Sequence, residues 1–182
     1  MNITIRLASP PDAPEMAEVL MRSWEEAYGD IIPEDFIRQK NAARPEQFRQ
    51  AITDGNEDEY VIQESGRIIG IMKVAPPLDD DLGGDYYELR YLYLHPDYFR
   101  RGVGKRAMAF AFDKARQFDR QYMSVWLFAE NKNAADFYIK CGFAPDGKTQ
   151  TKDCGRPMEC IRMIKNLLEL VARARFWNSV IS

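Results

Sequence analysis

A glycine-bearing turn with cationic neighbours is the stretch of this sequence best suited to binding an anion. Its residues read RRGVGK, from Arg100 to Lys105. The start of a helix leaves backbone N–H groups without partners, and the helix dipole makes that end attractive to anions. Gly102 and Gly104 lack the Cβ atoms that would keep a phosphate away from these donors. The pattern predicts a phosphate-binding turn; the alternative is a turn whose glycines serve only tight packing.

The turn does not match the two common nucleotide-binding motifs. A dinucleotide fingerprint needs a third glycine where Ala107 stands. A P-loop needs a first glycine where Phe99 stands, and Ser or Thr where Arg106 follows the Gly-Lys pair. The residues therefore indicate an anion site of another kind.

The turn is expected to lie between a strand and a helix, within residues 86–119. The apolar run Leu89–Leu94 predicts a buried strand, and His95-Pro96-Asp97 ends it because proline cannot continue a sheet ladder. After the turn, four apolar residues share one helical face: Ala107, Ala111, Ala115 and Phe118.

The rest of the chain mixes strands and helices. Further strands are expected at 3–7, 59–64, 67–74, 123–128, 148–153 and 158–164. Further helices are expected at 11–28, in short pieces starting at Pro33 and Pro45, after Asn131 or Asn133, and over 166–180. This order predicts an α/β (α+β) fold of three layers. We expect one domain over 1–165, with 166–182 as its C-terminal helical extension.

Composition and charge restrict the class of protein. The chain has 182 residues, 46% of them apolar, as expected of one globular domain. Its net charge of −3 argues against a nucleic-acid partner, and no apolar run is long enough to cross a membrane. There is no secretory signal pattern, and three cysteines without a CxxC pair indicate reduced thiols in a cytoplasmic protein. With His95 as the single histidine, neither a histidine triad nor a metal site is expected.

Two motifs together resemble a known family. The segment LYLHPDYFRRGVGKRAM, over 92–108, is similar to the acetyl-CoA motif of the GNAT superfamily of N-acetyltransferases. The segment VWLFAENKNAADFYIKCGF, over 125–143, is similar to that family's companion motif. The resemblance covers roughly residues 3–164 and implies a mixed central sheet flanked by helices, with acetyl-CoA as co-substrate. One departure is Phe99, which stands where the family carries Gln or Arg.

The resemblance also implies which residues hold the cofactor. The pantetheine arm would lie between two splayed parallel strands, against the backbone of Leu92, Tyr93 and Leu94. The pyrophosphate would be held by the turn: Arg100, Arg101, Gly102, Val103, Gly104 and Lys105. Asn131 would bond the pantetheine or its neighbouring backbone, and the alternative for Asn131 is a helix cap and nothing more.

The same resemblance implies direct transfer of the acetyl group to an amine. Tyr138 matches the family's tyrosine acid, which protonates the leaving thiolate and would also contact the cofactor; the alternative for it is core packing. Glu88 is the candidate base, which removes a proton from the amine directly or through water. The alternative for Glu88 is a solvated charge at a strand end. His95, before a proline, is expected to be structural.

The acceptor is expected to be a primary amine of a small molecule, a polyamine or a peptide. Trp24, Tyr28 and Asp80, from the acidic loop 79–85, are the candidate contacts, because aromatic walls rimmed by carboxylates suit a cation. By default Trp24 and Tyr28 are core residues.

A second hypothesis for the function is a non-catalytic acyl-CoA-binding sensor. The terminal helix is apolar on two sides, which favours a homodimer over a helix laid on its own sheet.

Overall fold

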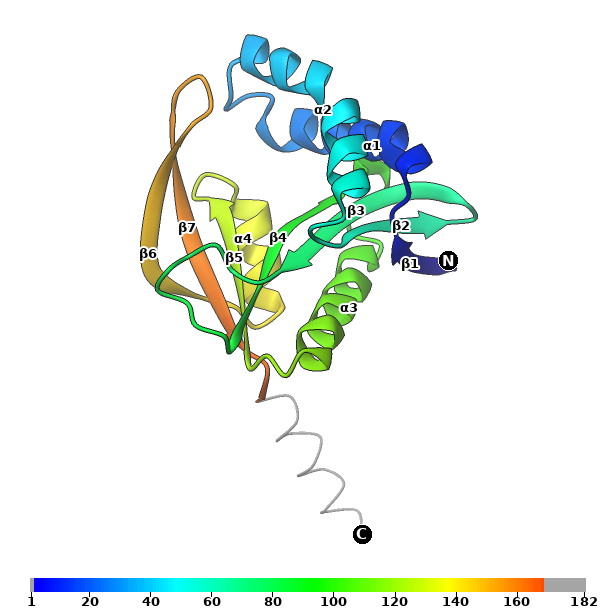
Figure 1. Ribbon diagram of the computed structural model, residues 1–182. Coiled ribbons are helices and arrows are strands. Elements are labelled where there is room, and N and C mark those ends of the chain that lie inside the picture. The colour runs from blue at the N-terminus through cyan, green and yellow to red at the C-terminus, as the bar shows by residue number, and fades with distance from the viewer. Residues whose placement is uncertain (1, 169–182) are drawn as a thin grey trace.

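The computed structural model describes residues 2–168, whose strands form a seven-stranded sheet with helices on both faces (Figure 1). The strand order is β1-β2-β3-β4-β5-β7-β6. The strands are β1 (Ile3–Leu7), β2 (Glu59–Glu64), β3 (Arg67–Ala75), β4 (Tyr86–Leu94), β5 (Tyr122–Phe128), β6 (Ala144–Asp153) and β7 (Pro157–Asn166). Within these residues β4 and β5 pair in parallel and the other neighbours pair antiparallel, so the predicted mixed sheet is confirmed.

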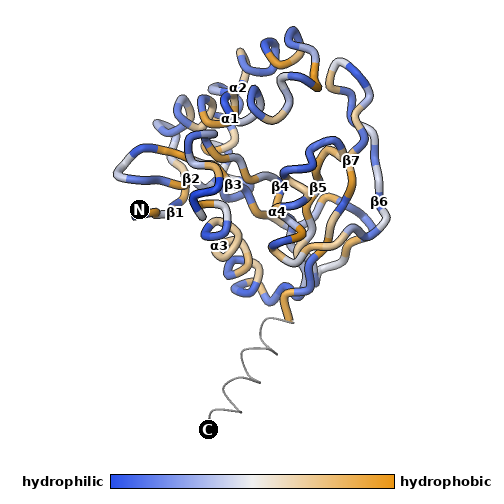
Figure 2. Tube along the Cα trace, turned by 180° about the vertical axis from the view of Figure 1, so that it is seen from behind, coloured by the Kyte–Doolittle hydropathy of each residue, from blue (hydrophilic) through white to orange (hydrophobic). Residues whose placement is uncertain are grey.

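Four α-helices cover the two faces of the sheet in the described part of the chain. They are α1 (Ala13–Tyr28), α2 (Glu34–Asp54), α3 (Val103–Gln117) and α4 (Lys132–Lys140), with short 3-10 turns at η1 (Pro10–Asp12) and η2 (Pro96–Tyr98). The helices α1 and α2 pack on one face, and α3 and α4 pack on the other. Apolar and polar residues alternate along α1 and α3 (Figure 2), as expected of helices that bury one side. None of the described helices is long and apolar enough to cross a membrane.

The face of α3 that the sequence predicts to be apolar packs against the sheet, except at its end. Ala107, Ala111 and Ala115 are fully buried, and their small side chains let the helix lie close to Leu89 of β4. Phe118, expected on the same face, is instead 52% exposed. The helix ends at Gln117 and the next residues turn away, so the Phe118 ring covers only the edge of the core.

The helix α2 is continuous through Pro45, where we expected two short helices. Proline removes one backbone hydrogen bond and clashes with the preceding turn, which bends a helix without always ending it. Figure 1 shows α2 changing direction along its length. The bend lets both halves of α2 stay over α1 and the sheet, with Ile37 and Phe48 buried in separate clusters.

The last described strand is longer than predicted. The pattern placed its end at Ile164 and a helix from Asn166, but β7 continues to Asn166 and Leu167 is buried against the α3 face. The expected terminal helix and its dimer contact lie outside the described residues.

Candidate active site

The parallel strands β4 and β5 separate partway along their length. Their pairing runs from Tyr86 with Tyr122 to Leu89 with Val125 and stops there. A register shift in the β3–β4 pairing leaves Arg90 as an extra residue, and such a bulge bends a strand. From Tyr91 onward β4 pairs only with β3 among the described strands.

The predicted cofactor edge lies on this open part of β4. Leu92 and Leu94 point toward the face that carries α3, and Tyr93 packs on the face that carries α1. Their backbone groups that face β5 have no strand partner in the described chain. A ligand with amide groups could add to this edge as an extra strand does.

The glycine-bearing turn presents free backbone donors. Among the described residues, no group accepts a hydrogen bond from the N–H groups of residues 100–105, and α3 begins at Val103. Arg100 has a positive φ of 60° and Gly102 one of 82°, so the turn passes through the left-handed region before the helix starts. The side chains of Arg100, Arg101 and Lys105 are exposed and make no ion pair within residues 2–168.

The two glycines of the turn play different parts. A Cβ at Gly102 would meet nothing within 4 Å, so this position faces open space. A Cβ at Gly104 would lie 3.0 Å from the Phe137 ring of α4. The anion-binding and packing interpretations of the turn therefore apply to different glycines. His95 accepts a hydrogen bond from Asp97 N at 3.3 Å, which fixes η2 and fits the structural role expected for it.

Tyr138 lies beside the gap between the separated strands. It projects from α4, is 7% exposed, and packs edge-on against Phe143 with ring centroids 5.6 Å apart. Burial raises the pKa of its hydroxyl, and the nearby hydroxyls of Tyr93 and Tyr28 raise it further. Because Tyr93 and Tyr28 belong to the opposite face of the sheet, three hydroxyls from both faces meet at the gap. Tyr138 is therefore protonated at neutral pH and forms no hydrogen bond with a described residue.

Asn131 begins α4 and also contacts α1. Its Oδ1 accepts a hydrogen bond from Ala134 N at 3.0 Å, which is the helix cap anticipated from the sequence. Its Nδ2 donates to the Tyr28 hydroxyl at 2.9 Å. The side chain is thus more than a cap, because it joins elements on the two faces of the sheet beside the gap.

Glu88 is buried rather than solvated, being only 6% exposed. It accepts a hydrogen bond from Leu78 N at 3.2 Å and lies 3.0 Å from Nη1 of Arg90. Burial raises the pKa of its carboxyl, and the Arg90 charge opposes that rise. A solvated strand-end charge is therefore excluded for Glu88, although its partners also give it a structural role.

Ser124 is a candidate that our reading of the sequence missed. It pairs with Glu88 across the parallel ladder, is 0% exposed, and its Oγ has no hydrogen-bond partner in the described chain. The signal was a polar residue inside the apolar run MSVWLF, at the strand position that shares a face with Glu88.

The aromatic residues expected to contact the acceptor form a cluster at the ends of α1 and β5. Trp24 and Tyr28 meet edge-on with centroids 5.3 Å apart, and Phe128 lies 5.3 Å from Tyr28. Tyr28 is 6% exposed and Trp24 is half-buried, so both contribute to the core while bordering the gap.

The acidic loop before β4 presents fewer free carboxylates than its composition indicates. Asp79 accepts a hydrogen bond from Trp126 Nε1 at 2.8 Å. Asp81 pairs with the buried Arg162 at 2.8 Å, and this guanidinium lowers the pKa of the Asp81 carboxyl. Asp80 is exposed and has no ion pair within residues 2–168. The loop is thus fastened to the sheet by Arg162, a residue that our sequence analysis did not single out.

Comparisons with known proteins find relatives in sequence and in fold. The chain is 28% identical over 153 residues to the "Probable N-acetyltransferase" of Mycobacterium tuberculosis, a match covering 82% of this chain and 84% of the relative. The crystal structure of PaiA N-acetyltransferase from Thermoplasma acidophilum, in complex with coenzyme A, superposes with a TM-score of 0.71 at 24% identity, over 91% of this chain and 99% of the other. The structure of yncA from Salmonella typhimurium, with its cofactor acetyl-CoA, gives 0.64 at 18% identity, over 92% and 95%.

The model of the acetyltransferase (GNAT) family matches residues 14–143, which include β4, the glycine-bearing turn and α4. This match covers more than half of the chain, and the fold is that of solved acetyltransferase structures. The chain therefore belongs to the GNAT family of acetyltransferases.

Proposed function

We propose that this protein transfers an acetyl group from acetyl-CoA to the primary amine of a small molecule, a polyamine or a peptide. The observation that carries the proposal is the open edge of β4 leading directly into a turn with free N–H donors. Solved relatives of the same fold are described with coenzyme A or acetyl-CoA bound.

The residues around the gap fit such a co-substrate. The backbone of Leu92, Tyr93 and Leu94 would bond the amides of the pantetheine arm, because that edge has no partner in β5. The unpaired N–H groups of residues 100–105 suit the pyrophosphate, and the exposed Arg100, Arg101 and Lys105 add positive charge. Phe99 in place of the family's Gln or Arg leaves this backbone site intact.

Bound acetyl-CoA supplies an acetyl thioester, which an unprotonated amine attacks with loss of the thiolate. Glu88 takes the proton from the amine, directly or through a water held by the unpartnered Ser124 hydroxyl. Its raised pKa makes it a stronger base than an ordinary carboxylate. Tyr138, which is protonated at neutral pH, donates its hydroxyl proton to the departing sulfur.

The test is release of the CoA thiol with a panel of amines, for the wild type and for Tyr138→Phe. Loss of the acid should lower kcat by about 10²- to 10⁴-fold, while CoA still binds because the phenylalanine ring keeps the packing of Tyr138. The control is Tyr122→Phe, which removes a hydroxyl at the far end of β5, beside Tyr86. CoA binding without turnover of any amine would instead favour an acyl-CoA sensor, and equal rates in both variants would exclude Tyr138 as the acid.

A further inference from the structure

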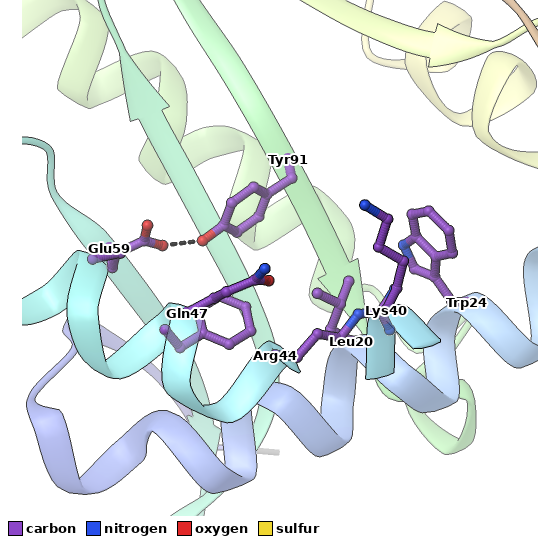
Figure 3. Close-up of a pocket in the computed structure, with 9 residues that line it drawn as sticks. Leu20, Trp24, Lys40, Arg44, Gln47, Glu59 and Tyr91 are labelled. Atoms are coloured by element: carbon purple, nitrogen blue, oxygen red, sulfur yellow. Dashed lines mark hydrogen bonds between the residues drawn. The ribbon is translucent and has the colours of Figure 1, made fainter. Parts of the chain in front are cut away.

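A cavity of about 320 Å³ lies between α1, α2 and the sheet (Figure 3). Leu20 and Trp24 of α1 and Tyr91 of β4 give it apolar and aromatic walls. Arg44 and Lys40 of α2 line the same cavity, so two cations border an otherwise largely apolar space.

Arg44 is buried without a counter-ion. Its side chain belongs to a residue that is 5% exposed, and its Nη1 has no hydrogen-bond partner among the described residues. The guanidinium stacks over the Trp24 ring, 4.7 Å from its centroid, which offsets only part of the cost of burying a charge. Burial accordingly lowers the pKa of Arg44. A buried cation of this kind is normally paired, so its environment lacks an anion.

The carboxylates near the cavity are already committed to other cations. Glu59 lines the cavity but pairs with Lys73 at 2.9 Å. Glu25 acts on Arg44 from a distance and pairs with Arg22 at 3.3 Å. Lys40 has no ion pair within residues 2–168. The cavity therefore carries an uncompensated positive charge.

This cavity adjoins the gap where the transfer is proposed. The Trp24 indole N–H makes no regular hydrogen bond but lies close enough to the Tyr93 hydroxyl to lower its pKa. The charge of Arg44 acts on the same hydroxyl. Tyr93 in turn neighbours the Tyr138 hydroxyl. Tyr91 of the cavity wall also stacks on Tyr93, with ring centroids 5.7 Å apart, and Trp24 meets Tyr28 edge-on at 5.3 Å. Aromatic side chains thus connect the cavity with the residues beside the gap.

We propose that Arg44, assisted by Lys40, binds the carboxylate of the acceptor, and that the acceptor is an amino acid. A carboxylate matches the planar fork of a guanidinium and would supply the missing counter-charge. The apolar walls suit the side chain of the amino acid, and its amine would lie toward Tyr93 and Tyr138. The inference rests on the proposed acetyl transfer and narrows the acceptor to amines that also carry a carboxylate.

The binding test uses the twenty standard L-amino acids and their amides, titrated into the full chain without acetyl-CoA. At least one acid should bind the wild type about 10- to 100-fold more tightly than its amide, as expected for a charge-assisted pair in a buried site. Arg44→Gln should bind the acid and its amide with equal affinity. Arg44→Lys keeps the charge but loses the planar fork, so its preference for the acid should be smaller than that of the wild type. The matched control is Arg49→Gln, an exposed α2 residue paired with Glu46, which should keep the wild-type ratio.

Three results would overturn the carboxylate site: equal affinity for acids and amides, no binding of any of the twenty acids, or an unchanged ratio in a folded Arg44→Gln or Arg44→Lys variant. Thiol release is measured separately with acetyl-CoA. Turnover of amines without any preference for a carboxylate would leave the transferase proposal standing and remove this one. Arg44-dependent binding of an amino acid without thiol release would leave the carboxylate site standing and remove the transferase proposal, and with it the role of the amino acid as acceptor.

Discussion

Asn131 donates a hydrogen bond from Nδ2 to the Tyr28 hydroxyl at 2.9 Å while its Oδ1 caps α4. Tyr28 is the last residue of α1, and Tyr138 projects from α4. One amide therefore positions the helix that borders the acceptor side relative to the helix that carries the proposed acid.

Replacing Asn131 by alanine should weaken both the fold and the proposed catalysis. The variant loses a helix cap, worth about 1 kcal/mol, and leaves the buried Tyr28 hydroxyl without this donor, at about 1 kcal/mol more. Thermal and denaturant unfolding measure the loss. Asn133→Ala, two residues along and exposed, should be nearly neutral, and equal unfolding midpoints for the two variants would contradict the bridging role.

Alanine at the two glycines of the turn should have different effects. At Gly104 the new Cβ would lie 3.0 Å from the Phe137 ring, so the packing of α3 on α4 must shift, at about 1–3 kcal/mol. At Gly102 there is open space, and the cost is about 1 kcal/mol from the positive φ of 82°. Denaturant unfolding of the Gly102→Ala and Gly104→Ala variants measures the loss of stability in each. Retention of full stability by Gly104→Ala would show that Phe137 yields without cost.

The carboxyl of Glu88 should set the acidic limb of the pH profile. Since burial raises its pKa and the base must be ionised, kcat/KM should rise with pH through a value above that of an ordinary glutamate. Glu88→Gln should lower kcat/KM by about 10²- to 10⁴-fold and flatten that limb. Glu159→Gln, at an exposed position of β7, is the control. An unchanged limb in Glu88→Gln would assign the base to another group.

The same carboxyl gives a stability prediction with a definite sign. Its folded pKa is raised, so folding favours the protonated form, and this contribution is present below the unfolded pKa and lost as pH rises through the folded pKa. Glu88→Gln has no such titration. The stability of the variant relative to the wild type should therefore increase as pH rises through that window, as followed by urea unfolding at several pH values.

The Asp12 carboxyl should change the stability of the fold with pH in the opposite direction to Glu88. Its carboxylate is held by both Nη atoms of Arg6 at 2.7 and 2.8 Å, and this hydrogen bonding lowers its pKa. A depressed pKa stabilises the fold above the unfolded value and loses that effect as pH falls through the folded one. Asp12→Asn weakens hydrogen bonds to a charged group and should cost about 1.5–3 kcal/mol at pH 7 and little in strong acid. Asp113→Asn, which breaks an exposed pair with Arg116, should cost less than Asp12→Asn at pH 7.

The fold was predictable because local and long-range signals agree in most of this chain. Alternating strands, the Ser65-Gly66 hairpin turn and the Gly142 helix end each indicate the element that forms there. Pro45 was one exception, since a proline that bends a helix cannot be distinguished by local pattern from one that ends it. The packing of α1 and α2 on the sheet decides between the two.

The candidate site was predictable only where backbone chemistry defines it. The glycine-bearing turn and the Asn131 cap depend on local geometry, which sequence spacing indicates. The pairing of Asp81 with Arg162 joins residues 81 positions apart, and the burial of Arg44 depends on how α2 packs over Trp24 of α1. When a charged residue lies at a helix position that the pattern predicts to be exposed, nothing in the local sequence indicates that another element will bury it.

The parallel ladder between β4 and β5 is short, so the two halves of the sheet are joined by fewer backbone hydrogen bonds than the other neighbouring strands. One leaf of the sheet, as we call each group of strands, consists of β1 to β4, and the other consists of β5 to β7. The backbone hydrogen bonds that join them, which we call the spine, end at Leu89 and Val125. Local opening in proteins starts where few backbone hydrogen bonds and few buried contacts hold two units together. A molecule bound in the gap would contact both leaves and hold them together. Amide hydrogen exchange along this spine would then slow for both leaves together whenever the gap is filled.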